Sequence, residues 1–395
     1  MIASSAQINY PPAGSTVRQP RGAVKINGNN VPGWIDFSVT NNTYFEADTF
    51  RVTYSATALT QMVAPDALYD ATWFSEIATD TFVEILAAVR VSNPDKPDPS
   101  EMSSLIYGRV DDIEYNPKLR TITLTGRDLT GALIDAKLPR DYTNQSASYI
   151  ATDLASQHNL IPVVTATTGR VGTTQPNGDV ELIQTQGSDW DLLAMLARQA
   201  GFICYVEQQG LYFQPESGDP DTYQITWTPP TKDVDYPTAS VVDLTFSRSL
   251  TIVKGVTVKA MSPGHANKAS VTRYYPTAPK AITPGKATAY GPTTLYTYWL
   301  PADMSTVAVE NFAINQYKLI TSHAMKLTAR LPADGVLAPR GVIINVNGTG
   351  TAYDQTYYPR SVTRTLSVEE GYAMTVEAQN FTPNLAVESS DVGAA

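Results

Sequence analysis

The sequence predicts a mainly β fold interrupted by one inserted α/β segment. With 27 prolines and 22 tyrosines among 395 residues, the composition suits a β-rich protein with many turns. Residues 34–39 and 50–54 alternate apolar and polar side chains, which is typical of half-buried strands. Residues 187–215 instead indicate a helix followed by a tight hairpin. A chain of this length is expected to form about two to four domains.

Acidic residues are concentrated in the middle of the chain. Residues 141–219 carry 9 acidic residues and only 2 basic ones, Arg170 and Arg198. The corresponding counts are 16 acidic and 12 basic for residues 1–140, and 13 and 14 for residues 220–395. This shift favours a separate domain at 141–219. It also argues against nucleic-acid binding there, because phosphate contacts need clustered Lys and Arg.

Residues 1–140 are predicted to form a first β region behind an extended N-terminal arm. The expected strands are 34–39, 50–54, 82–91, 106–115 and 119–125. A turn is expected at Asn41-Asn42, and short helices at 67–77 and 129–136. Gly126, Arg127 and Asp128 are expected to close the region as a structural turn or ion pair.

Residues 141–219 are predicted to form a small α/β domain. A helix at 145–157, capped by Asn144, precedes a strand at 161–164 and a loop at 166–178. Ser188 is a good N-cap for a second helix, and Gly201 is placed to take the left-handed conformation that ends it. The apolar stripe of this helix includes Leu192, Leu196 and Ala197. A hairpin containing Phe202, Tyr212 and Phe213 follows.

Residues 220–381 are predicted to form a second β region. Two strands, 241–246 and 252–259, are expected around a turn at Arg248-Ser249. Residues 261–301 are rich in Pro and Gly and are predicted to form a long loop. Ser305 is expected to cap a helix, followed by strands at 324–331, 342–346, 357–366 and 372–378. Residues 382–395 are predicted to be a flexible tail.

No sequence pattern indicates an active site, a cofactor or a metal. Nucleotide-binding loops and hydrolase or metalloprotease motifs are missing from the sequence. His158, His265 and His323 lack ligand spacing, and the single cysteine, Cys204, is expected to be buried and inert. Asp111 and Asp112 are adjacent on a predicted strand and point to opposite faces, which disfavours a metal site. A glycosidase-type site, in which two carboxylates converge from distant segments, remains open.

Three passages carry a family resemblance. The first is GSDWDLLAMLARQAGFICYVEQQGLYFQP at 187–215, the second is LIYGRVDDIEYNPKLRTITLTGRDLTGALIDAK at 105–137, and the third joins 337–342 with 357–362. In their order along the chain they resemble the baseplate hub proteins of contractile phage tails. That family includes the Mu-like hub, late control protein D and the N-terminal part of type VI secretion spike proteins. The residues that match the family pattern are Gly126, Arg127, Asp128, Leu192, Leu196, Ala197, Gly201, Phe202, Tyr212, Phe213, Pro339 and Gly341.

The resemblance implies two tube-like β-barrel domains flanking a small α/β domain. It also implies a homotrimer whose six barrels adapt a six-fold tail tube to a three-fold central spike and leave a channel for DNA. The implied partners are the spike protein, the tail tube protein or tube initiator, and other baseplate proteins, with DNA passing through without specific binding. The implied location is the virion tail baseplate, after assembly in the host cytoplasm. Since nothing after residue 380 could build a β-helical needle, we expect the spike to be a separate polypeptide.

The residues also leave other functions open. A tail or surface module that recognises a glycan or receptor would need a concave aromatic patch. An enzyme acting on peptidoglycan would depend on one specific carboxylate. The basic and aromatic residues at 273–275 and 280–286 favour a solvated loop over a nucleic-acid contact, and the Gly and Tyr density there would equally suit a protein–protein contact. The sequence shows no secretory signal and no run approaching the roughly 18 apolar residues of a membrane helix, so we expect no membrane-spanning segment.

Overall fold

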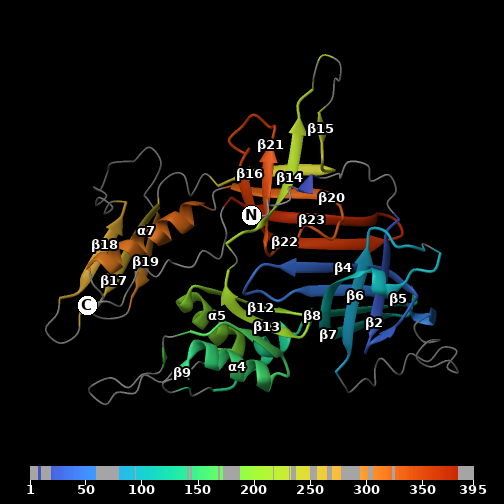
Figure 1. The fold of residues 1–395 in the computed structure, drawn as a ribbon, viewed down its shortest axis with the longest axis horizontal. Helices are drawn as coiled ribbons and strands as arrows, with labels where there is room; N and C mark the ends of the chain where they lie inside the picture. The colour runs from blue at the N-terminus through green and yellow to red at the C-terminus, as the bar shows by residue number, and fades with distance from the viewer. Residues whose placement is uncertain are drawn as a thin grey trace, which may run out of the picture.

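The computed structural model describes residues 8–9, 19–58, 80–93, 95–139, 142, 145–167, 170–171, 187–216, 218–230, 232, 237–249, 256–264, 269–276, 294–300, 306–322 and 325–380. Strands dominate these residues, so the predicted mainly β class is confirmed. Figure 1 shows an N-terminal β half in blue to teal, an α/β unit in green, a C-terminal β half in colours from yellow-green to red, and a smaller sheet with its own helix at the left.

The N-terminal β half is a run of antiparallel neighbours in the order β4-β5-β8-β7-β6-β2-β3. Period-two alternation buries one face of each strand, as β5 shows with Phe50, Val52 and Tyr54 inside. The predicted strands of this region are confirmed. Its elements are β2 (Arg21–Ile26), β3 (Asn29–Asn30), β4 (Trp34–Asn42), β5 (Thr49–Ser55), β6 (Phe82–Ala88), η1 (Pro99–Glu101), β7 (Ser103–Asn116), β8 (Thr121–Asp128) and α3 (Thr130–Asp135).

The C-terminal β half is built around β22, which pairs with β21, β23 and a strand of the other half. Its β22–β23 hairpin turns just before Gly371, where φ is +70°, as the sequence predicts. The strands of this half are β1 (Ile8–Asn9), β14 (Asp221–Thr228), β15 (Thr238–Ala239), β16 (Asp243–Arg248), β20 (Met325–Pro332), β21 (Val342–Asn347), β22 (Thr356–Ser367) and β23 (Gly371–Gln379).

The ladder between β4 and β22 joins the two halves into one fifteen-stranded sheet. Residues 36–42 of β4 run antiparallel to residues 361–367 of β22. One hydrophobic core draws on both halves, with Phe37 and Val52 from the first and Val362 and Met374 from the second all at most 1% exposed. The two expected barrels are therefore two lobes of one sheet, and among the described strands no ladder closes either lobe into a ring.

The α/β unit packs two helices against a three-stranded sheet in the order β10-β13-β12. Its second helix begins with a complete capping box, in which Ser188 and Asp191 bond each other's backbone amides. It ends at Gly201, whose φ of 69° is left-handed, as predicted. The elements of this unit are β9 (Gln145–Ser146), α4 (Ala147–Gln157), β10 (Ile161–Val164), β11 (Arg170–Val171), α5 (Asp189–Ala200), β12 (Phe202–Glu207) and β13 (Gly210–Pro215).

A second small unit lies apart from the large sheet (Figure 1). It consists of β17 (Val256–Ser262), β18 (Val271–Tyr275), β19 (Thr294–Trp299) and α7 (Thr306–Ser322). Val258 and Ala260 of β17 pack against Val309 and Ala313 of α7. The prediction of one long loop at 261–301 is therefore wrong where β18 and β19 lie, because these short strands are paired through the central strand β17.

Several local predictions need correction. Asn41 and Asn42 end β4 instead of forming a turn, because Asn41 is buried and hydrogen-bonded. The cap of α4 is Ser146, whose side chain accepts a bond from the Tyr149 amide, and not Asn144. Strands β16 and β17 do not form a hairpin, since β16 pairs with β20 and β17 with β18 and β19.

The helix predicted at 67–77, the cap at Ser305, the tail at 382–395, and His265 and His323 lie outside the described residues. The strands predicted near 324–331, 342–346, 357–366 and 372–378 are confirmed as β20 to β23. Within the described part of the chain, no helix is both long and apolar enough to cross a membrane. The domain boundaries at 140, 219 and 381 remain predictions.

A substitution at Gly126 can test how closely β8 approaches β7. A Cβ atom there would lie 2.0 Å from the Arg109 carbonyl oxygen and 2.7 Å from the Phe50 ring. We expect Gly126→Ala to destabilise the fold by about 1–3 kcal/mol or more, measured as a lower midpoint of urea unfolding. Gly335→Ala is the matched control, because a Cβ atom added there would meet no described atom within 4 Å, and it should leave the midpoint nearly unchanged. Equal midpoints for the two variants would contradict the strand packing.

Candidate functional site: a three-way junction

The loop between β4 and β5, residues 43–48, lies where the N-terminal half, the C-terminal half and the α/β unit meet. We call it the junction loop. The Thr43 amide donates to the Arg360 carbonyl at 2.9 Å, and the Phe45 amide donates to the Cys204 carbonyl at 3.1 Å. The indole Nε1 of Trp190 donates to the Phe45 carbonyl at 3.1 Å. The loop is thus bonded through its backbone to both other parts.

A buried ion pair reinforces the junction. The Arg340 guanidinium bonds the Asp48 carboxylate, with Nη2 and Oδ2 2.8 Å apart and side chains only 15% and 6% exposed. The same carboxylate accepts bonds from the Asn42 amide at 2.7 Å and from the Asn41 side chain at 3.0 Å. Arg340 also lies over the Tyr205 ring of β12, 4.8 Å from its centroid. One guanidinium therefore touches all three parts.

A second buried guanidinium holds the loop that carries Arg340. Arg364 of β22 donates to Asn41 Oδ1 at 3.2 Å, to the Asp334 carbonyl at 3.2 Å, and to the Leu337 carbonyl. The Asp334 carboxylate accepts the Tyr223 hydroxyl at 3.0 Å and the Leu337 amide at 3.0 Å. These bonds satisfy the buried charge and fix the loop at 333–341 against β4.

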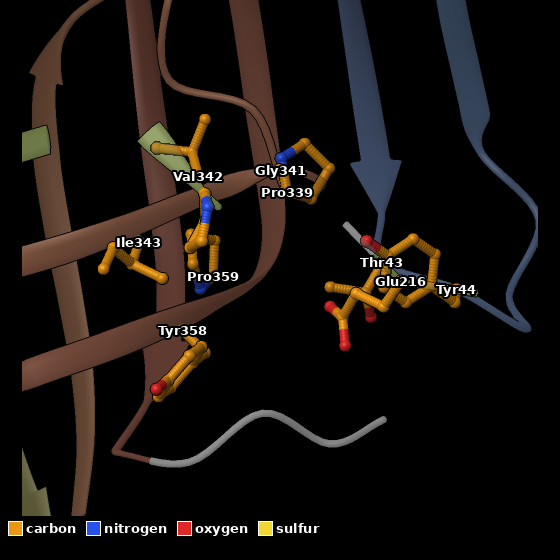
Figure 2. Close-up of a pocket in the computed structure, with 10 residues that line it drawn as sticks. Thr43, Tyr44, Glu216, Pro339, Gly341, Val342, Ile343, Tyr358 and Pro359 are labelled. Carbon is orange, nitrogen blue, oxygen red and sulfur yellow. The ribbon is translucent and has the colours of Figure 1, made fainter. Parts of the chain in front are cut away.

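The junction contains a pocket of about 180 Å³ (Figure 2). Figure 2 shows Thr43, Tyr44 and Glu216 facing Pro339 and Gly341 across it, with Tyr358 and Pro359 below. The Tyr44 hydroxyl is hydrogen-bonded to Glu216, and burial raises the pKa of Tyr44 well above its usual range. Prolines and aromatic rings suit packing. Among the described residues, no group of three His, Cys, Asp or Glu side chains is arranged to hold a metal ion.

Asp128 lies beneath the junction loop with its backbone amide bonded to the Asp48 carbonyl at 2.9 Å. Its carboxylate accepts the Thr130 amide at 3.1 Å and the Thr130 hydroxyl at 3.0 Å. Burial, followed by the nearby charge of Asp48, raises the pKa of Asp128 to about 8. The carboxyl group is therefore largely protonated at neutral pH.

The residues singled out by the resemblance fall into three groups. Asp128, Pro339 and Gly341 lie at the junction, where Gly341 has a left-handed φ of +70°. Arg127 does not pair with its neighbour Asp128. It binds Asp111 at 2.7 Å and Asp135 at 2.9 Å on the partly exposed outer face.

The remaining residues of that set pack the α/β unit or the strands. Leu192, Leu196 and Ala197 are at most 1% exposed in the α5 core. Phe202 and Phe213 meet edge to face at 5.4 Å, and the Tyr212 ring stacks on Tyr205 at 4.7 Å. Tyr205 in turn contacts Arg340, so the hairpin reaches the junction.

Sequence reasoning missed the charged centre of the junction. Asp48 and Arg340 are separated by 292 positions, and Asn41 and Arg364 by 323. A signal was present at Arg364, a charged residue at an inward position of the alternating strand β22. His158 was expected to be a helix C-terminal partner, and it does cap α4, with Nε2 2.8 Å from Asp189 at the start of α5.

Two tail proteins of known structure share this fold. A tail protein from Neisseria meningitidis MC58 superposes with a TM-score of 0.62 at 14% identity, covering 93% of this chain and 99% of that chain. A 43 kDa tail protein of prophage MuSo2 from Shewanella oneidensis gives a TM-score of 0.58 at 16% identity, with the same coverage. A component of the Escherichia coli type VI secretion system gives a TM-score of 0.48 at 12% identity, covering 92% and 78%. No protein-family model and no curated protein sequence matches the chain. The chain therefore has the fold of the two tail proteins over nearly its whole length.

Removing the buried guanidinium should weaken the junction strongly. We expect Arg340→Leu to cost about 3–5 kcal/mol in the free energy of unfolding, because Asp48 would be left buried and unpaired. Arg360→Leu is the control: its bond to Glu46 is 3.5 Å long, both side chains are about half exposed, and its loss should cost less than about 1 kcal/mol. Adding Asp48→Asn to Arg340→Leu should recover part of the loss. Chemical denaturation checks this, and equal losses for the two arginine variants would refute the role of Arg340.

Asp128 should make stability fall as pH rises. Its folded pKa of about 8 lies above the ordinary value of 3.8, so its contribution is fully present below about pH 4 and is lost as pH rises through about 8. Asp128→Asn should flatten the dependence of the free energy of unfolding on pH. Between pH 5 and 8 the stability of the variant should therefore rise relative to that of the wild type. Asp135→Asn is the control: bonds from Arg127 lower the pKa of Asp135, which keeps it ionised throughout that window. Unfolding midpoints measured across this pH range decide the matter, and parallel curves for wild type and Asp128→Asn would contradict the expectation.

Proposed function

We propose that this chain is a structural hub protein of a contractile phage tail baseplate. The carrying observation is the fold, which corresponds to two tail proteins over 93% of this chain and 99% of each of theirs. Because the match covers nearly all of this chain and of both tail proteins, it supports a shared role for the whole chain and not for a single domain. The proposal assigns the protein no catalytic residue and no cofactor.

The hub would be a homotrimeric ring. Each subunit offers two β lobes side by side, joined through β4 and β22. Three subunits would thus present six lobes, which suits an adaptor between a six-fold tail tube and a three-fold central spike. A load-transmitting adaptor needs lobes that do not slide, and the shared core together with the buried Asp48–Arg340 pair supports such rigidity.

The proposed partners are the central spike protein, the tail tube protein or tube initiator, and other baseplate proteins. The net charge of −10 favours a lumen that DNA passes through without specific binding. The protein would be assembled in the host cytoplasm and reside in the virion tail baseplate. The edge strand β19 is a candidate contact, because its Trp299 is 70% exposed.

The solution mass tests the ring. Sedimentation over a range of concentrations should give a molecular mass three times that of one 42.8 kDa chain. Trp299→Ala should shift the equilibrium toward the monomer if β19 contributes to the subunit contact. Leu138→Ala is the control. This side chain is 59% exposed, and its replacement should not shift the equilibrium toward the monomer.

The outcomes separate the hub from its proposed contact. A trimer that persists in Trp299→Ala removes β19 from the subunit interface and leaves the ring intact. A monomer at all concentrations that also forms no three-fold complex with a spike protein overturns the hub function.

A further inference from the structure

A second, larger pocket lies close to the junction, because Asp128, whose amide bonds the Asp48 carbonyl, is among the residues that line it. Its volume is about 460 Å³, and it opens between the N-terminal β half and the ends of α4 and the β12–β13 turn. That size is within the range of pockets that hold small ligands. No residue of the proposed subunit contact lines it.

One wall of this pocket is aromatic. Phe82 of β6 and Tyr107 of β7 have ring centroids 5.9 Å apart and planes only 2° from parallel. The ladder pairs Phe82 with Arg109 and Tyr107 with Glu84, so the two rings are diagonal neighbours on one face of the sheet. Parallel planes at this distance mean that the two rings stack offset on each other, and an outer face of the pair is a surface against which a flat apolar face can lie.

The end of α4 and the β12–β13 turn contribute polar groups to the lining. They include Asn159, Gln209 and the imidazole of His158, which Asp189 holds at 2.8 Å. Asn159 follows the His158 cap of α4 with a left-handed φ of 55° and lines the pocket. Carboxamides both donate and accept hydrogen bonds, so they match ligands whose groups do the same, such as hydroxyls.

The charges of the pocket do not favour an anion. Arg109 lies 3.9 Å from Asp80 and 3.1 Å from Asp135, so its positive charge is already compensated. Asp128 also lines the pocket, and burial raises its pKa to about 8, so it is largely neutral at pH 7. A phosphate-bearing ligand would find no surplus of cations among these lining residues.

We propose that this pocket binds a neutral sugar ring. The apolar face of the ring would lie against Phe82 and Tyr107, and its hydroxyls would bond the amides of Asn159 and Gln209. The ligand class is thus a neutral hexose or N-acetylhexosamine, as a single residue or the end of a glycan. The inference does not rest on the hub function, because every residue involved lies within one chain.

Saturation-transfer NMR on the full chain tests the proposal. The probes are glucose, galactose, N-acetylglucosamine, lactose, maltose and chitobiose at millimolar concentration, with adenosine monophosphate as the charged planar alternative. At least one sugar should receive saturation. Tyr107→Ala and Gln209→Ala should each weaken its Kd about tenfold, whereas Tyr107→Phe should retain binding because it keeps the aromatic face.

Tyr149→Ala is the matched control, since Tyr149 is a 54% exposed aromatic residue of α4 that does not line the pocket, and it should bind like the wild type. Thermal melting identifies any variant that fails to fold. If Tyr107→Ala does not fold, unchanged binding in Gln209→Ala, or lost binding in a folded Tyr107→Phe, overturns the proposal. The proposal is overturned if no sugar binds, if binding survives unchanged in both Tyr107→Ala and Gln209→Ala, or if only adenosine monophosphate binds.

Discussion

The buried pair of Asp48 and Arg340 is the constraint on which the arrangement of the three parts depends. A guanidinium and a carboxylate removed from water cost several kcal/mol each unless their bonds are satisfied. Here the carboxylate accepts three different donors, and the guanidinium is also covered by the Tyr205 ring. These partners come from β4, from the loop at 333–341 and from β12. Separating the two β halves would leave a buried charge unpaired, and moving the α/β unit would uncover the guanidinium, so both changes would cost free energy.

The fused sheet extends this constraint to both β lobes. Seven residue pairs of β4 and β22 place the two β lobes in one ladder, and the aliphatic core continues beneath it. The α/β unit is inserted between them in sequence, yet it is attached at their seam through Phe45, Trp190 and Cys204. Segments far apart in the chain are therefore joined at one seam.

Local order was largely predictable from the sequence, and long-range order was not. The capping box at Ser188, the left-handed Gly201 and the hairpin at 357–378 follow from neighbouring residues, whose chemistry is visible in a short window. The β4–β22 ladder and the Arg340–Asp48 pair join residues about 300 positions apart, and nothing local in β4 indicates its partner. The strands β18 and β19 were missed because they are short and flanked by Pro and Gly, so that pairing with β17, not propensity, makes them strands.

The β12–β13 hairpin links the two candidate sites mechanically. At its strands, Tyr205 and Tyr212 stack under Arg340 at the junction. At its turn, Gln208 bonds Ser104 of β7 at 2.8 Å, and Gln209 lines the larger pocket. A two-stranded ladder with six paired positions does not bend easily, so the turn and the strands move together. A ligand that pulled the turn toward Phe82 and Tyr107 would therefore act on the same element that carries the Arg340 contact, and the acidic insertion would couple the pocket to the seam between the lobes.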